Sequence, residues 1–142
     1  MKTWLASRSG VVALSAIALL NFVARSLLDW RYVLPDMADF SGTAALPTAA
    51  INVLLAVGWV WAILAAVQGS RRALIALAVL NLVLLVALAV ATTLVLCPSP
   101  CPTVWPVVEI VNWGNLIFGL LAAFSAWVSW RRLAGESEIA KR

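Results

Sequence analysis

The chain has 142 residues, of which 64% are apolar and only 11% are charged, and its mean hydropathy is +1.02. Soluble domains contain about 45–50% apolar and about 25% charged residues, and a domain this small leaves much of its surface in water. The composition therefore excludes a soluble protein, and with it most nucleic-acid-binding proteins and cytosolic enzymes. The sequence has no histidine, which excludes His-ligated haem or zinc and an imidazole general base.

Four apolar stretches are long enough to cross a bilayer, whose hydrocarbon core of about 30 Å requires about 20 helical residues. Backbone groups in lipid need partners within their own segment, so each stretch is predicted to be a helix. The predicted spans are residues 9–28, 45–67, 73–96 and 104–130, in a single transmembrane domain that covers residues 1–142. The expected fold class is an all-α integral membrane protein, a four-transmembrane-helix bundle.

The first stretch differs from the other three because Arg25 interrupts its apolar run. Its basic start and its Ala24-Arg25-Ser26 sequence are also compatible with a cleaved signal peptide. We expect a retained span, in which the Arg25 side chain reaches the outer interface or pairs with Asp29 one turn further on.

The basic residues are distributed unevenly between the two sides of the predicted bundle. Eight of the ten lie on one side: Lys2, Arg8, Arg71, Arg72, Arg131, Arg132, Lys141 and Arg142. Only Arg25 and Arg31 lie on the other side. The positive-inside rule places the side with eight in the cytoplasm. Both termini and the loop 68–72 are thus predicted to be cytoplasmic and the loops 29–44 and 97–103 to lie outside, in the inner membrane of a prokaryote.

Aromatic residues near both ends of the spans predict interfacial anchors in contact with lipid. On the inner side these are Trp4, Trp127 and Trp130, and on the outer side Trp30, Tyr32 and Trp105.

An offset of 60 residues aligns the chain with itself. It matches Ala13–Val23 to Ala73–Val83, including Asn21 with Asn81, and it also pairs Asn52 with Asn112. Because asparagine is costly in hydrocarbon, matched asparagines are more informative than matched leucines. We predict a duplicated helical hairpin with a pseudo-two-fold axis along the membrane normal; coincidence is the alternative in so apolar a sequence.

Every predicted span carries at least one asparagine, and the fourth also carries Glu109. The outer half and the middle of the bundle are expected to hold a polar cluster of Arg25, Glu109, Asn21, Asn52, Asn112 and Asn115. One hypothesis is structural: the amides bond between helices, Glu109 pairs with Arg25, and each interhelical bond contributes about 0.6 kcal/mol. The other is functional: the cluster binds a polar solute, a cation or a proton.

Both cysteines lie in the Cys97-Pro-Ser-Pro-Cys101-Pro segment on the outer side. A close pair outside the cytoplasm predicts a structural disulfide. Thiol–disulfide exchange and metal capture are the alternatives, although the spacing is not C-x-x-C and a metal would need further ligands.

The sequence carries no recognisable catalytic or phosphate-binding motif. The leading hypothesis is a small non-catalytic integral subunit or accessory protein that packs in the bilayer against other membrane subunits or against itself. No cofactor, haem, metal or nucleic-acid partner is expected. The alternatives are a homo-oligomeric channel or transporter that uses the cluster around Glu109, and an outer-face thiol–disulfide enzyme that uses Cys97 and Cys101.

Overall fold

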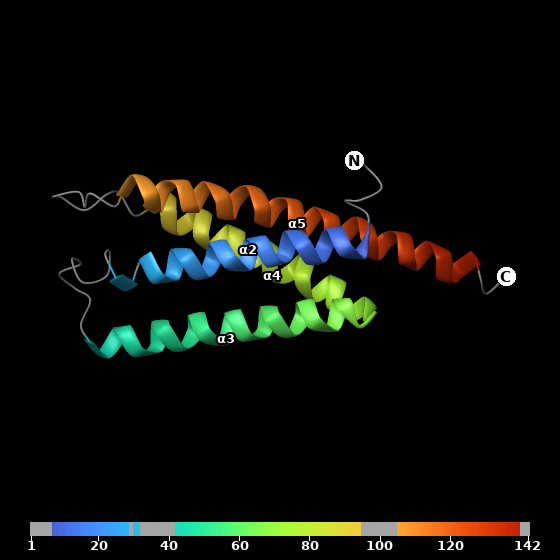
Figure 1. Ribbon diagram of the computed structural model, residues 1–142, viewed down its shortest axis with the longest axis horizontal. Helices are drawn as coiled ribbons and strands as arrows, with labels where there is room; N and C mark the ends of the chain where they lie inside the picture. The colour runs from blue at the N-terminus through green and yellow to red at the C-terminus, as the bar shows by residue number, and fades with distance from the viewer. Residues whose placement is uncertain (1–6, 29, 32–41, 95–104, 140–142) are drawn as a thin grey trace.

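The computed structural model describes residues 7–28, 30–31, 42–94 and 105–139, and in these ranges it is helical, without strands (Figure 1). The helices are α2 (Arg8–Leu28), α3 (Gly42–Val67), α4 (Arg71–Leu94) and α5 (Trp105–Ile139). Three segments are long and apolar enough to cross a membrane: Arg8–Leu28, Ala49–Val67 and Pro106–Leu133. The prediction of long apolar helices is therefore confirmed.

The helix boundaries differ from the predicted spans mainly at the end of the chain. α5 continues to Ile139, nine residues beyond the predicted limit of 130. Residues 131–139 combine arginine, leucine, alanine and glutamate without proline, and such residues favour helix even outside lipid. α5 is 35 residues long, so at a rise of 1.5 Å per residue it is about 20 Å longer than the thickness of a hydrocarbon core of about 30 Å.

Serine side chains cap two of the helices at their first turn. The Ser7 hydroxyl oxygen accepts a hydrogen bond of 3.1 Å from the Gly10 amide at the start of α2. The Ser70 hydroxyl oxygen accepts one of 3.4 Å from the Ala73 amide at the start of α4. Each cap satisfies an amide that has no partner within its helix, which fixes where the helix begins.

A tight turn at Gly69 connects α3 to α4. The Ser70 amide donates to the Ala65 carbonyl at 3.0 Å and the Gly69 amide donates to the Ala66 carbonyl at 3.2 Å. This pattern is the Schellman motif, which requires a left-handed residue at the position of Gly69, and its φ is 101°. The Gly69 carbonyl also accepts a 3.2 Å hydrogen bond from Arg8 Nη2, which ties the start of α2 to this turn.

The Gly69→Ala substitution is expected to destabilise the fold by about 1 kcal/mol, because alanine is strained at positive φ. In addition, a Cβ at this position would lie 3.1 Å from Arg8 Nη1. Gly58→Ala is the matched control, since a Cβ there meets no atom within 4 Å and alanine favours helix interiors by about 0.5–1 kcal/mol. Unfolding of the purified chain should show opposite signs for the two variants; equal effects would contradict the argument.

The helices run alternately up and down, and α5 packs along both α2 and α4 (Figure 1). α3 makes less extensive contacts with α2 and with α4. The start of α2, the α3–α4 turn and the end of α5 lie at the same end of the bundle (Figure 1). Five arginines therefore share this end: Arg8, Arg71, Arg72, Arg131 and Arg132.

Small side chains occupy much of the bundle interior. On α5 the buried positions Asn115, Gly119, Ala122, Ala126 and Ser129 follow one another at intervals of four and three residues. This spacing is that of a left-handed bundle seam. Many large apolar side chains lie on the outside instead, among them Leu20, Ile110 and Phe124. The arrangement is typical of helices packed in lipid, where small residues permit close approach and large ones contact acyl chains.

The predicted duplication of the hairpin remains a prediction. In its support, Asn21 Nδ2 donates to the Ile17 carbonyl at 3.1 Å and Asn81 Nδ2 donates to the Leu77 carbonyl at 2.7 Å. Both bonds link equivalent positions of the two copies. The hairpins nevertheless pack differently, because α4 and α5 contact each other far more extensively than α2 and α3 do.

Candidate functional site

Two of the predicted polar residues, Asn21 and Asn115, meet between α2 and α5. Asn115 Nδ2 donates a long hydrogen bond of 3.5 Å to the Asn21 backbone carbonyl. Between them the Gly114 backbone faces the Asn21 side chain, and a Cβ at Gly114 would lie 3.2 Å from Asn21 Oδ1. The absence of a side chain at Gly114 thus allows the two helices to approach at this level.

The other members of the predicted cluster occupy different environments. Arg25, Asn52 and Asn112 are half-buried, and Glu109 is exposed on the outer surface of α5. Asn112 Oδ1 is buried without a hydrogen-bond partner among the described residues. The structure therefore joins Asn21 to Asn115, and the pairing of Arg25 with Glu109 stays a prediction.

The polar cluster expected from the sequence includes Glu109 together with Asn112 and Asn115. The structure places Glu109 beside the buried face of α5 and not on it. In the structure the seam runs through Val108, Asn112 and Asn115, with Val108 fully buried. Glu109 is displaced by one position from this seam, which at 100° per residue turns its side chain outward.

The predicted anchors are described only in part. Trp30 and Trp127 are exposed and Trp130 is half-buried, which is the environment expected of an interfacial aromatic residue. The side chains of Trp4, Tyr32 and Trp105 and the cysteine pair Cys97 and Cys101 lie outside the described residues. The anchoring roles and the disulfide remain predictions.

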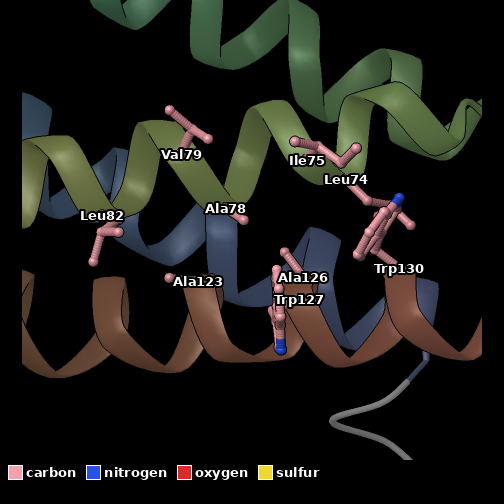
Figure 2. Close-up of a pocket in the computed structure, with 9 residues that line it drawn as sticks. All are labelled: Leu74, Ile75, Ala78, Val79, Leu82, Ala123, Ala126, Trp127 and Trp130. Atoms are coloured by element: carbon pink, nitrogen blue, oxygen red, sulfur yellow. The ribbon is translucent and has the colours of Figure 1, made fainter.

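An apolar groove of about 450 Å³ lies between α4 and α5 (Figure 2). Figure 2 shows Ala78 and Leu82 of α4 directed toward α5, with Trp130 at the end beside Leu74 and Trp127 between Trp130 and Ala123. α4 contributes Leu74, Ile75, Ala78, Val79 and Leu82, and α5 contributes Ala123, Ala126, Trp127 and Trp130. Its volume lies within the range of about 300–1,000 Å³ that is typical of small-molecule sites.

The tryptophan end of this groove is next to the arginine-rich end of the bundle. The Arg131 guanidinium carbon lies 4.9 Å from the centre of the Trp127 ring, a cation–π contact. The Trp127 and Trp130 rings are tilted by 37° with centroids 5.6 Å apart. The contact fixes a positive charge beside the mouth of the groove.

Sequence reasoning missed several buried groups, of which Trp59 is the largest. Trp59 is 3% exposed and its ring centroid lies 5.9 Å from that of Phe22 on α2. Ser15 and Ser129 are also buried, and within the described ranges their hydroxyl oxygens have no hydrogen-bond partner. The spacing of small residues along α2 and α5 was the signal that could have located both serines.

The described residues hold no group of three or more acidic, cysteine or histidine side chains arranged for a metal ion. Comparison of the chain with protein families, with curated proteins and with solved structures finds no match. Its function must therefore be argued from its own geometry.

Proposed function

We propose that the protein is a small integral membrane subunit of a prokaryotic inner membrane, which crosses the bilayer four times and packs against another membrane protein through α3. α4, a 24-residue helix that carries no charge beyond its first two residues, is the remaining span beside the three apolar segments described above. The observation that carries the proposal is the incomplete packing of α3 within the chain.

The orientation in this proposal follows from the clustering of arginines at one end of the bundle. Arg8 is tied to the α3–α4 turn by its hydrogen bond to Gly69, and Arg71 and Arg131 lie at the same end (Figure 1). The positive-inside rule assigns this end to the cytoplasm. Both termini are then cytoplasmic, and Arg31 lies at the opposite surface.

α3 presents a face that no other part of the described chain covers. Ile51, Leu54 and Trp61 are 57%, 70% and 70% exposed. They surround Gly58, at which a Cβ would meet no atom within 4 Å. We call Ile51, Leu54, Gly58 and Trp61 the α3 face.

Gly58 is the feature of the α3 face that favours a protein partner over lipid alone. Glycine in a helix interior lowers stability by about 0.5–1 kcal/mol relative to alanine. Contact with lipid does not compensate for this loss, because acyl chains do not require a small side chain. A neighbouring helix does gain, because its backbone can approach closely where the side chain is small. The exposed Leu54 and Trp61 side chains on either side of Gly58 then supply the contact area.

The Gly58→Leu variant tests this function directly. A side chain at position 58 starts from a Cβ that meets no atom within 4 Å, so the fold should persist while a leucine excludes the partner. We expect wild type, purified in mild detergent, to co-elute with a stoichiometric membrane protein or a second copy of itself, identified by mass spectrometry, and the variant to elute alone.

Val60→Leu is the matched control, because Val60 is also exposed on α3, at 45%, but lies about 200° around the helix from Gly58. It should retain the partner. A wild-type chain that elutes alone, or a partner that survives Gly58→Leu, would contradict the proposal. Loss of solute flux from liposomes on Glu109→Gln, with unchanged assembly, would support the transport hypothesis in its place.

A further inference from the structure

The groove between α4 and α5 combines an apolar interior with positive charge at one end. Leu74, Ile75 and Trp130 line that end, and beyond it lie the exposed Arg71 and Arg131. We propose that this groove binds one acyl chain of an anionic phospholipid from the cytoplasmic leaflet, and that Arg71 and Arg131 bind its phosphate. The inference rests on the membrane placement proposed above but does not depend on a partner at α3.

The length of the groove matches one leaflet. Its lining on α4 runs from Leu74 to Leu82, which corresponds to about 12 Å at a rise of 1.5 Å per residue. Half of a hydrocarbon core of about 30 Å is about 15 Å. A helix of another protein that crosses the bilayer would need a groove along its whole span, whereas an acyl chain that enters from the cytoplasmic surface ends near the midplane.

The helix geometry brings both arginines to the mouth of the groove. Arg71 lies one turn before Ile75, and residues four apart share a face of the helix. Arg131 lies one turn after Trp127, and because helical side chains lean toward the N-terminus it covers the ring at 4.9 Å. One arginine on each of the two helices is therefore available at the end of the groove where a headgroup would lie.

The charge at this end favours an anion. Arg8, Arg72 and Arg132 add to the positive potential of Arg71 and Arg131. The acidic residues on this side, Glu136 and Glu138, follow Arg131 along α5 by five residues or more, which places their backbone at least about 7 Å further from the groove. Tryptophans at the headgroup level, here Trp127 and Trp130, are typical of a lipid-contacting interface.

The test is native mass spectrometry of the full-length protein released from phosphatidylcholine nanodiscs that contain a minority of phosphatidylglycerol with the same acyl chains. Wild type should retain phosphatidylglycerol in preference to phosphatidylcholine. Arg71→Gln and Arg131→Gln should each weaken this retention by about fivefold, which corresponds to about 1 kcal/mol for one basic residue near the membrane surface. Arg31→Gln removes the same charge at the opposite end of the bundle and should change nothing.

Two groove-filling variants test the acyl chain separately from the charge. Ala123→Phe and Val79→Phe should both abolish retention, and Ala50→Phe, which adds the same ring outside the groove, should not. Val79 is 52% exposed, so a phenylalanine at this position is compatible with folding even if Ala123→Phe is not.

Equal retention of the two lipids, or retention that survives Val79→Phe in a folded chain, would overturn the inference. Displacement of the lipid by excess inorganic phosphate would also overturn it, because it would show that the arginines bind phosphate without the groove. These experiments measure lipid retention by the chain without a partner. The lipid inference can therefore fail while a partner is still found at α3, and the α3 proposal can fail while the lipid is still retained.

Discussion

Replacing Trp59 with alanine is expected to lower the free energy of unfolding by about 3–5 kcal/mol, the range for truncating a buried aromatic side chain. Trp59 joins α3 to α2 through its contact with Phe22 and belongs to the buried core together with Ala62 and Ala66. Because α3 has few other buried side chains, the expected result is detachment of α3 before the remaining helices separate. Unfolding of the purified chain in detergent, followed by tryptophan fluorescence and by helicity, measures the loss.

Trp61→Ala is the matched control for this prediction. Trp61 lies two residues further along the same helix but is 70% exposed, so its truncation should change the stability of the isolated chain by no more than about 0.5 kcal/mol. Similar losses from Trp59→Ala and Trp61→Ala would show that α3 does not pack on α2 as described.

Replacing Ala122 with leucine is the second large effect we expect, with a loss of about 1–3 kcal/mol through overpacking. Ala122 is fully buried and lies among the buried small residues that follow one another along α5. A leucine has to displace a neighbouring helix, and lipid offers no hydrophobic force that compensates for the lost contacts. The same unfolding assay measures it, and Ala50→Leu at an exposed position should leave the stability unchanged.

Stability that is retained or raised in Ala122→Leu would contradict the close packing of the seam. The comparison is informative because the substitution makes the chain more apolar. In a protein held together by burial of apolar surface away from water, a larger apolar side chain has at least a partial benefit. In a bilayer that benefit vanishes, and only the fit of the side chain remains.

Packing at α3 and lipid binding at the groove concern different parts of the molecule. The α3 face is centred on Gly58, whereas the groove lies between α4 and α5. A partner at the first and an anionic lipid at the second can therefore be present together. In that case the lipid would lie between α4 and α5, on a surface that the partner at the α3 face does not cover.

The two buried asparagines differ in their hydrogen bonds, since one bonds within its own helix and the other bonds to a neighbouring helix. Asn81 is 1% exposed, and its side-chain amide donates a hydrogen bond to the Leu77 carbonyl of its own helix. The Asn115 side-chain amide donates to the Asn21 carbonyl on α2. Amides on two helices are thus used in different ways. Which of them bond within a helix and which bond between helices depends on the local distance between backbones, and this distance is set by residues such as Gly114.

The sequence by itself determined that the chain forms long apolar helices and, apart from the end of α5, nearly where they begin and end. The apolar runs, the Ser70 cap and the glycine at position 69 are local signals, and they act through hydrogen bonds within a few residues. The uneven distribution of arginines between the two sides of the predicted bundle was also evident from the sequence alone. These features do not depend on which helices come together, which is why they could be predicted without the tertiary structure.

Only the tertiary structure decided which face of each helix is buried. In a soluble protein, polar residues indicate which face of a helix is exposed. A helix that is apolar on all sides can place any face in lipid, so hydropathy does not indicate which face is buried. Trp59 is therefore buried while Trp61 is exposed, and Glu109 faces outward beside a seam that includes Asn115. The close approach at Gly114, the groove beside Trp127 and the open face of α3 all depend on side-chain size and on contacts between distant segments, which no local pattern in the chain specifies.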